Sequence, residues 1–257
     1  MPVPFAKIES ERLSTAVVRQ IEDLIIRGIL RPGDRLPSER ELSERLGVSR
    51  PSLREAVGEL QERGLLSAKA GAGIYVSDVL GSAFSPALVK LFASHDAAVF
   101  DYIAFRRDME GLAAAPAARL GSDTDLAVVD TVFKKMEAAH TKRNPTDEAT
   151  LYAEFHLAII EASHNVIMLH MMRSMMDLLR EGVLYNRTVM FKQRATRELL
   201  LDQHRAINDG LQARNPDSAQ AAVEAHLTFV LTCLKDQTEA DKHELIARKR
   251  LEHEQAR

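Results

Sequence analysis

The chain has 257 residues, of which 46% are apolar and 28% are charged, enough for two globular domains with a core each. No apolar run approaches the roughly 18 residues of a membrane span, and the N-terminus lacks the hydrophobic segment of a signal peptide. The only cysteine, Cys233, excludes an internal disulfide and suits a reducing compartment. We therefore expect a cytoplasmic protein that is not attached to a membrane.

The net charge of −3 is distributed unevenly along the chain. Residues 1–77 carry 12 Lys+Arg against 11 Asp+Glu, and the remaining residues carry 22 against 26. Between positions 35 and 54, five arginines face only three glutamates. Such a local basic excess suits nucleic-acid binding. Its modest size favours a dimer, whose two half-site contacts would add.

Two short helices are predicted near the N-terminus. The first spans residues 13–27, where apolar residues recur at helical spacing, and Gly28 ends it. The second begins at Ser38, whose side chain is expected to form a capping box with Glu41. Gly47 ends this second helix, which supports the element that follows.

The third predicted helix has the features of a DNA recognition helix. It begins at Ser49 and ends at Gly64, with its apolar positions facing inward. Arg50 and Arg54 lie one turn apart at its exposed N-terminal end, where a guanidinium can contact guanine or phosphate through two N–H groups. Two helices joined by a short glycine-containing turn, the second beginning with arginine, form a helix-turn-helix.

A β-hairpin is predicted directly after this helix. Residues 67–69 and 74–76 form its strands, and Gly71 and Gly73 allow positive φ in the turn and close approach to a sugar–phosphate chain. The N-terminal part is thus predicted to be a winged helix-turn-helix of three helices and a β-hairpin wing. The alternative is a small helical subdomain whose arginines are merely solvated.

The segment RPGDRLPSERELSERLGVSRPSLREAVGELQERGLL, with the glycines of the wing, closely resembles the DNA-binding domain of GntR-superfamily transcription regulators. The resemblance implies DNA contacts by Arg40, Arg50 and Arg54, with Gly71 at the wing tip. Arg35 is expected to contact a phosphate. The full set of expected DNA-binding residues is Arg35, Arg40, Ser49, Arg50, Ser52, Arg54 and Gly71.

The second half is predicted to be an all-α antiparallel bundle, so the whole protein is mostly α. Helical periodicity continues to about residue 236, and no second strand pattern occurs. Helices are expected at about residues 86–94, 97–119, 123–141, 147–163, 165–187, 194–213 and 216–236. The predicted organisation is a winged helix-turn-helix domain at 10–77, a linker at 78–85, an effector-binding and dimerisation domain at 86–236, and a charged tail at 237–257 that is a frayed helix or disordered.

Three histidines on different predicted helices can form a metal site. Neutral imidazoles from facing helices bind Zn²⁺, Ni²⁺ or a similar ion in the core of a bundle. The candidates are His156, His204 and His226. The alternative is that each is an ordinary buried or exposed histidine.

Residues 10–236 as a whole resemble the FadR-like branch of GntR regulators, and the second half looks like its FCD effector domain. In that domain an Asp and a His in the pattern D-x-x-F-H, with two further His, bind a divalent metal. His156, His204 and His226 match this set, whereas Tyr152 takes the place of the Asp. A phenol with a pKa of about 10 is a poor ligand near neutral pH, so Tyr152 is expected to donate its hydroxyl to an effector instead.

The segment FDYIAFRRDMEG resembles the family's R-x-x-L-E element, with Arg106 and Glu110 as its charged residues. Arg106 would bind a small organic acid bidentately, and the alternative is a structural ion pair with Glu110. The segments PALVKLF, EASHN and LYNRTVMF look most like the lactate-, glycolate- and pyruvate-responsive regulators. The implied effector is a short hydroxy- or keto-carboxylate, bound by Arg106, Tyr152, His156, His204 and His226.

We therefore predict a homodimeric transcription regulator, most simply a repressor, that binds a double-stranded DNA operator and is not an enzyme. The helix at 86–94 is the expected transmission element between its halves. The rival hypothesis is a metal-dependent hydrolase using the three His, but the sequence offers no carboxylate beside them as general base, since Glu154 is two residues from His156 and points elsewhere. An architectural DNA binder would leave Arg106 and the histidines unexplained.

Overall fold

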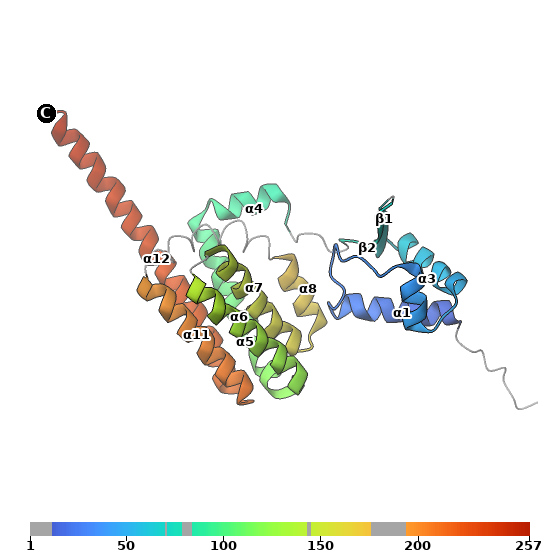
Figure 1. Cartoon of the computed structure of the whole chain (residues 1–257). Helices are drawn as coiled ribbons and strands as arrows, with labels where there is room; N and C mark the ends of the chain where they lie inside the picture. The colour runs from blue at the N-terminus through green and yellow to red at the C-terminus, as the bar shows by residue number, and fades with distance from the viewer. Residues whose placement is uncertain (1–11, 70, 79–83, 143–144, 176–193) are drawn as a thin grey trace, which may run out of the picture. The chain divides into compact units, whose positions relative to one another are not determined.

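The structure is a computed structural model of the whole chain, shown in Figure 1. It describes residues 12–69, 71–78, 84–142, 145–175 and 194–257. The chain folds into two compact units, Met1–Gly81 and Ser82–Arg257, which we call the N-terminal unit and the C-terminal unit. Among the described helices, none has the length and the apolar composition needed to cross a membrane.

The N-terminal unit contains the three predicted helices, α1 (Leu13–Ile26), α2 (Glu39–Leu46) and α3 (Arg50–Glu62). Ser38 caps α2 by accepting a hydrogen bond from the Glu41 amide, with an N···O distance of 3.3 Å, and the left-handed Gly47 ends the helix. The Glu41 carboxylate instead lies 2.6 Å from Arg45 Nη2. Among the described residues it forms no hydrogen bond with the Ser38 amide, so only one of the two hydrogen bonds of the predicted capping box is present. The helices and the hairpin share one apolar core, formed by Val17, Val18, Ile21, Leu36, Leu53, Ala56, Val57, Leu60, Leu66 and Val76.

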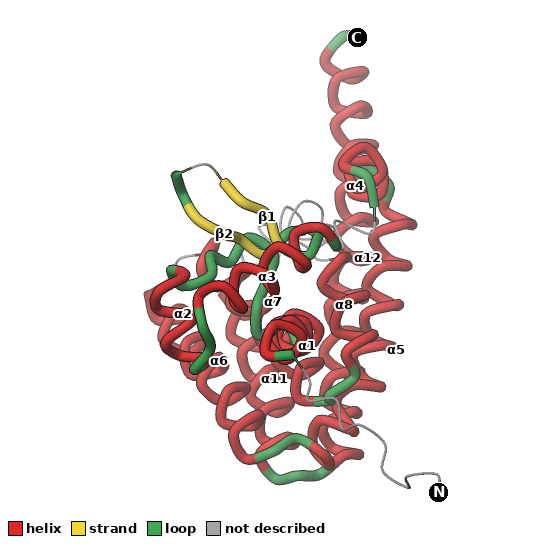
Figure 2. The backbone as a smooth tube through the Cα atoms, turned by 90° about the vertical axis from the view of Figure 1, so that its right-hand side faces the viewer, coloured by secondary structure: helices red, strands yellow, loops and turns green. Residues whose placement is uncertain are grey.

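The wing is a two-stranded sheet with an additional edge segment. Strands β1 (Leu66–Lys69) and β2 (Gly73–Val76) pair antiparallel, as predicted, and Figure 2 shows them as a projecting hairpin. Residues 34–36 run along the other edge of β2, where Arg35 forms an isolated antiparallel bridge with Tyr75. The chain before α2 therefore fixes one edge of the wing.

The C-terminal unit is an all-α bundle, as predicted. Helices joined by short loops, such as α5 with α6 and α11 with α12, run antiparallel, and α5 packs against α4, α7, α11 and α12 (Figure 1). The described helices are α4 (Pro86–Ala93), α5 (Asp96–Leu120), α6 (Asp123–Lys142), α7 (Pro145–Ala162), α8 (Val166–Ser174), α11 (Arg194–Gln212) and α12 (Pro216–Gln255).

Two clusters of buried apolar side chains form the core of this bundle. One cluster includes Phe133, Phe155 and Ile207, and the other includes Ile103 and Leu200. Along α5, α11 and α12, the residues of one cluster give way to those of the other partway along the helix. The buried polar side chains of the candidate site lie at this boundary.

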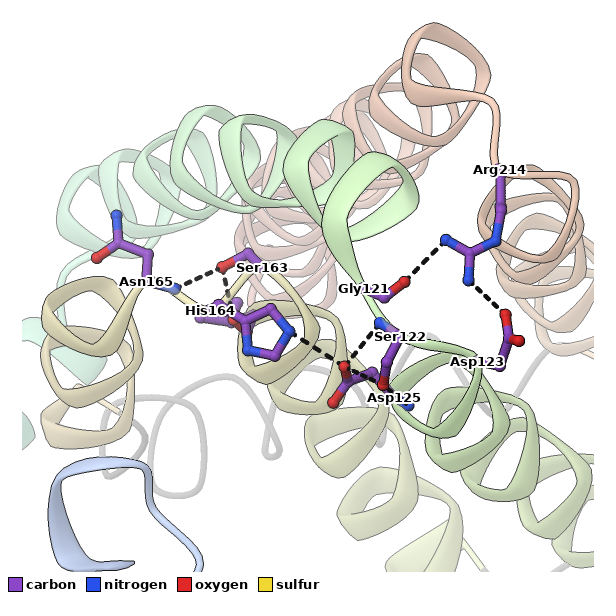
Figure 3. A network of polar contacts seen from close by, with 9 residues as sticks. Gly121, Ser122, Asp123, Asp125, Ser163, His164, Asn165 and Arg214 are labelled. Carbon is purple, nitrogen blue, oxygen red and sulfur yellow. Dashed lines mark hydrogen bonds and ion pairs between the residues drawn. The ribbon is translucent and has the colours of Figure 1, made fainter. Parts of the chain in front are cut away.

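A polar network joins three loops at one end of the bundle (Figure 3). Asp125 in α6 accepts a hydrogen bond from the Ser122 amide at 2.8 Å and lies 3.1 Å from Nε2 of His164. Arg214, before α12, donates from Nη1 to the Gly121 carbonyl at 2.8 Å. Because these contacts bind the loop before α6 to the loops after α7 and after α11, they hold the ends of the bundle helices in register.

The structure differs from the prediction at the C-terminal end of α8 (Val166–Ser174). The helix predicted at 165–187 begins with Asn165 as N-cap, but it ends at Ser174 with Met175 as C-cap, and residues 176–187 lie outside the described residues. Of the predicted linker, residues 79–83 are likewise outside them, and Ser85 caps α4 by accepting a hydrogen bond from the Leu88 amide at 3.3 Å.

The C-terminal tail is helical rather than disordered. Helix α12 has 40 residues and runs to Gln255, well beyond the predicted end at 236, and its last part extends past the other bundle helices in Figure 1. Contacts between residues four apart support it, including Arg248 Nε to Glu244 Oε1 at 2.8 Å. Such pairs stabilise an exposed helix by about 0.2–0.5 kcal/mol each. The charged composition of the tail alone did not distinguish a helix from disorder.

Candidate DNA-contacting surface and buried histidine site

Helix α3, the predicted recognition helix, presents Arg50 and Arg54 to solvent. Ser49 caps the helix by accepting a hydrogen bond from the Ser52 amide at 3.3 Å, and the two hydroxyl oxygens are 2.9 Å apart. Arg50 and Arg54 are exposed, whereas Leu53 on the same turn is 1% exposed. The N-terminal end of α3 is therefore open for contact with DNA.

The arginines of this surface differ in how far their charge is neutralised. Arg54 Nε lies 2.5 Å from Glu39 Oε1, a pairing between α3 and α2 that the sequence had not indicated. Arg40 Nη1 is 3.7 Å from Glu44 Oε1, and no carboxylate of the described residues lies within 4 Å of Arg50. Arg50 thus carries the least compensated charge of the three.

The two remaining expected DNA contacts, Arg35 and Gly71, lie on the wing. Gly71 has φ of +70° in the hairpin turn, which is the left-handed conformation predicted for it. Arg35 is exposed on the edge segment beside β2. The structure thus places every expected DNA-binding residue on the surface of the N-terminal unit, in α2, α3 and the wing.

The expected effector and metal residues meet inside the C-terminal unit. They come from four helices, α5, α7, α11 and α12, and each is at most 3% exposed. The buried set consists of Arg106, Glu110, Tyr152, His156, His204 and His226. The structure therefore brings together all five effector-site residues predicted from the sequence.

A chain of charged and polar contacts crosses this interior. Arg106 Nε donates to Glu110 Oε1 at 2.6 Å, and the other carboxylate oxygen, Oε2, lies 2.5 Å from His156 Nδ1. On the far side of the same ring, His156 Nε2 is 3.2 Å from His204 Nε2. Glu110 thus links the arginine of the expected acid site to the first of the three histidines.

The other two histidines are oriented through their Nδ1 atoms. His204 Nδ1 is 2.6 Å from the Leu200 carbonyl oxygen, and His226 Nδ1 is 2.9 Å from Gln203 Oε1. Because these oxygens only accept hydrogen bonds, each Nδ1 carries the proton and each Nε2 keeps its lone pair. Gln203 was not predicted, although it directly precedes His204 in the sequence.

This arrangement fits a divalent metal ion. Each of the three histidines offers one ring nitrogen to a group whose members all lie within 4.8 Å of one another. Two Nε2 lone pairs 3.2 Å apart repel unless a proton or a cation lies between them. The acceptors at Nδ1 are the partners that orient metal-ligating histidines. Tyr152 is placed as a stacking partner: its ring lies against His204 with centroids 4.6 Å apart.

A second arginine fixes the helices that carry these side chains. Arg197 Nε in α11 donates to Glu148 Oε2 in α7 at 2.8 Å, and its Nη2 also contacts the His140 carbonyl. Glu148 is only 1% exposed. Because Arg197 lies two turns before His204, and Glu148 one turn before Tyr152, this pair holds α11 against α7 next to the site.

The electrostatics keep Arg106 and Glu110 ionised. Burial alone would raise the pKa of Glu110, but the positive charge of Arg106, the neighbouring His156 ring and the hydrogen bonds of both lower it to about 2. Burial alone would lower the pKa of Arg106, and the Glu110 charge outweighs this effect and raises it. Arg106 Nη1 is buried and has no hydrogen-bond partner among the described residues. The expected structural ion pair with Glu110 is present, and one edge of the guanidinium remains available.

One sequence-based statement needs correction. The sequence indicated no carboxylate beside the three histidines, but Glu110 lies against His156. The contact joins residues 46 positions apart, on α5 and α7, so their separation along the chain could not reveal it. A carboxyl group with a pKa of about 2 that is bound to Arg106 is nevertheless a poor general base.

Replacing Glu110 by glutamine is expected to destabilise the C-terminal unit by about 3–5 kcal/mol, because Arg106 would keep its charge without a buried partner. On folding, the pKa of Glu110 falls from 4.5 to about 2, so its contribution is complete above about pH 4.5 and is lost as pH falls toward 2. Urea unfolding followed across this pH range measures both effects. Asp108→Asn, which removes an exposed carboxylate from the same helix, is the control. Equal stability of the two variants would contradict the prediction.

Comparison with known proteins identifies both units. The family described as "Bacterial regulatory proteins, gntR family" matches residues 13–76, and the family described as "FCD domain" matches residues 101–229. The Glc operon transcriptional activator of Escherichia coli (strain K12) is 32% identical over 243 residues, which cover 93% of this chain and 95% of that protein. The Putative L-lactate dehydrogenase operon regulatory protein of the same strain is 34% identical over 248 residues, 94% of each chain.

A solved structure agrees with these matches. The chain is similar to Streptococcus agalactiae GntR, with a TM-score of 0.54 and 25% identity over 86% of this chain and 99% of that one. The matched families and relatives are regulators and not enzymes, so the rival hypothesis of a metal-dependent hydrolase is wrong. The chain belongs to the GntR family of bacterial transcription regulators, in the branch that carries an FCD domain.

Proposed function

We propose that the protein regulates transcription in response to a short hydroxy- or keto-carboxylate of the lactate, glycolate or pyruvate class. The observation that carries the proposal is the buried Arg106, which retains an unpartnered Nη1 and is linked through Glu110 to the three histidines. A carboxylate is well matched to a buried guanidinium, because it can accept two charge-assisted hydrogen bonds. The names of the Glc operon and L-lactate dehydrogenase operon relatives support an acid of this class.

A divalent metal ion such as Zn²⁺ or Ni²⁺ is the second part of the proposal. His156, His204 and His226 would hold it, and when bound it would supply positive charge that attracts the effector carboxylate. Tyr152 adds no negative charge to the three histidines, whereas the Asp of the D-x-x-F-H pattern that it replaces would add one. Metal binding should therefore be weaker here and more dependent on the acid, to which Tyr152 would donate its hydroxyl.

Regulation requires that the acid bind one arrangement of the dimer better than another. We propose a homodimer in which two N-terminal units bind the two half-sites of an operator, with α4 transmitting the change from the C-terminal unit. Repression is the simplest outcome, because a dimer bound to DNA excludes polymerase until the acid releases it. This proposal also includes a location in the cytoplasm and the limits of the two domains, residues 10–77 and 86–236.

Arg50→Ala and Arg54→Ala are each expected to weaken specific operator binding by about 1–3 kcal/mol, because a bidentate contact to a base edge is lost. The operator is first selected from random duplex DNA with the parent protein, and affinities are then compared by fluorescence anisotropy. Arg45→Ala is the matched control, since Arg45 is exposed in α2 and pairs with Glu41 at 2.6 Å. Full operator affinity of the double variant at 50 and 54 would show that α3 is not the recognition helix.

Arg106→Lys is expected to weaken binding of lactate, glycolate and pyruvate by about 1.5–3 kcal/mol, roughly tenfold to a hundredfold. Lysine keeps a positive charge for Glu110 and removes the planar fork, so the fold is retained. Titration calorimetry measures the affinities, with Arg107→Lys, the neighbouring arginine paired with Asp108 at 2.7 Å, as control. If no acid distinguishes Arg106→Lys from the parent, the acid binds elsewhere.

His204→Ala is expected to abolish stoichiometric binding of Zn²⁺ or Ni²⁺, because one of three ligands and its Nδ1 orientation are lost. Native mass spectrometry with elemental analysis measures the metal content of the purified protein. His243→Ala is the control, because His243 is exposed in α12. Retention of the metal by His204→Ala, with loss in the control, would exclude the three-His site.

A further inference from the structure

The three histidines of the buried site hold their Nδ1 atoms against three chemically different groups. His204 Nδ1 lies 2.6 Å from a backbone carbonyl oxygen of its own helix, α11. His156 Nδ1 lies 2.5 Å from a carboxylate oxygen of Glu110. His226 Nδ1 lies 2.9 Å from Oε1 of Gln203. Of these three partners, the one that faces His226 is a neutral side chain.

The first two partners cannot change what they offer to the ring. A backbone carbonyl oxygen only accepts hydrogen bonds, and so does an ionised carboxylate. Glu110 is also fixed by Arg106, whose Nε donates to its other oxygen at 2.6 Å. A carboxamide is different, because one of its ends accepts hydrogen bonds and the other donates them. The orientation of the Gln203 amide therefore decides which kind of group meets His226.

The two orientations of this amide select different tautomers of His226. With Oε1 facing the ring, as in the structure, Nδ1 carries the proton and Nε2 keeps the lone pair that a metal ion needs. With the amide turned over, its NH₂ group would donate to Nδ1, and the ring would carry its proton on Nε2. Only the first orientation leaves Nε2 of His226 ready to bind a metal ion.

Gln203 connects the two helices that carry the second and third histidines. It directly precedes His204 in α11, and its side chain crosses to His226 in α12. His226 is 0% exposed, whereas Gln203 is half-buried. The two helices also belong to one apolar cluster, to which they contribute Leu211 and Leu227. Their packing therefore does not depend on this hydrogen bond, so a role of Gln203 in joining the helices is not enough to explain it.

We propose that Gln203 is a positioning residue for the metal site, whose amide oxygen selects the tautomer of His226 that presents Nε2 to a divalent ion. This role rests on the proposed binding of a metal ion by the three histidines and adds to it a residue outside the ligand set. Because Tyr152 stands where a carboxylate ligand is expected, the site depends on its three imidazoles. Incorrect orientation of one of them should therefore weaken metal binding strongly.

Calorimetric titration of the full-length protein with Zn²⁺ and with Ni²⁺ tests this role. Gln203→Leu removes the acceptor and should weaken metal binding about tenfold to a hundredfold, the usual effect of losing such a partner. Gln203→Glu keeps an acceptor at the same place and should bind at least as tightly as the parent. Gln220→Leu is the matched control, because Gln220 is also half-buried and its amide donates to Glu224 at 2.8 Å within α12.

A second measurement uses the protein without metal. Long-range proton–nitrogen NMR correlation spectra of the histidine rings distinguish a ring nitrogen that carries a proton from one that does not. The signals of His226 are assigned by comparison with His226→Gln. His226 should carry its proton on Nδ1 in the parent and in Gln203→Glu, whereas Gln203→Leu should shift part of the population to the tautomer protonated on Nε2.

The outcomes separate this role from the metal site itself. Parental metal affinity in Gln203→Leu, with binding still abolished by His204→Ala, would overturn the role and leave the site intact. Equal losses in Gln203→Leu and Gln203→Glu, or an equal loss in Gln220→Leu, would also overturn it, since the acceptor would not be what matters. An unchanged His226 tautomer in Gln203→Leu would exclude tautomer selection. A parent protein that binds neither ion would overturn the metal site and this role together.

Discussion

The contact on which the C-terminal unit depends is the buried ion pair between Arg106 and Glu110, whose side chains are 2% and 3% exposed. A charge removed from water is tolerated only when a partner of opposite sign and further hydrogen bonds compensate it. Glu110 meets this condition for Arg106 and, with its second oxygen, orients His156. One carboxylate therefore both compensates the buried guanidinium and orients the first histidine.

This polar chain lies where the two apolar clusters of the bundle meet, and it is built on helices rather than on loops. Each histidine is held by a contact at Nδ1, and the ion pair between Arg197 and Glu148 aligns the helices that carry His204 and Tyr152. The unpartnered Nη1 of Arg106 belongs to α5, the helix that packs against α4, α7, α11 and α12. If an acid binds there, as proposed, it would act directly on the helix with the most neighbours in the bundle.

The N-terminal unit uses its charges differently, because they face water. Arg54 and Arg45 are paired with glutamates, whereas Arg50, Arg35 and Lys69 have no carboxylate within 4 Å among the described residues. A paired arginine adds little to non-specific attraction but can still contact a base with its remaining N–H groups. The uncompensated cations lie at the start of α3 and on the wing, where they can meet phosphate. This division explains how a chain with a net charge of −3 can bind DNA.

The sequence by itself determined the two-part architecture, because helix caps, turn glycines and apolar spacing are local properties. The residues expected at the buried site came from the resemblance to a family and not from these local patterns. Ser38, Gly47 and Ser49 delimit helices without reference to the rest of the fold, and Gly71 takes its predicted conformation. For the tail the sequence left a frayed helix and disorder open, and the structure shows a helix to Gln255, supported by side-chain pairs such as Arg248 with Glu244. Only the tertiary structure decided three contacts: Glu110 with His156, Gln203 with His226, and Arg35 and Lys69 beside β2. Each of them depends on which helices or strands pack side by side, and not on the spacing of residues within one element.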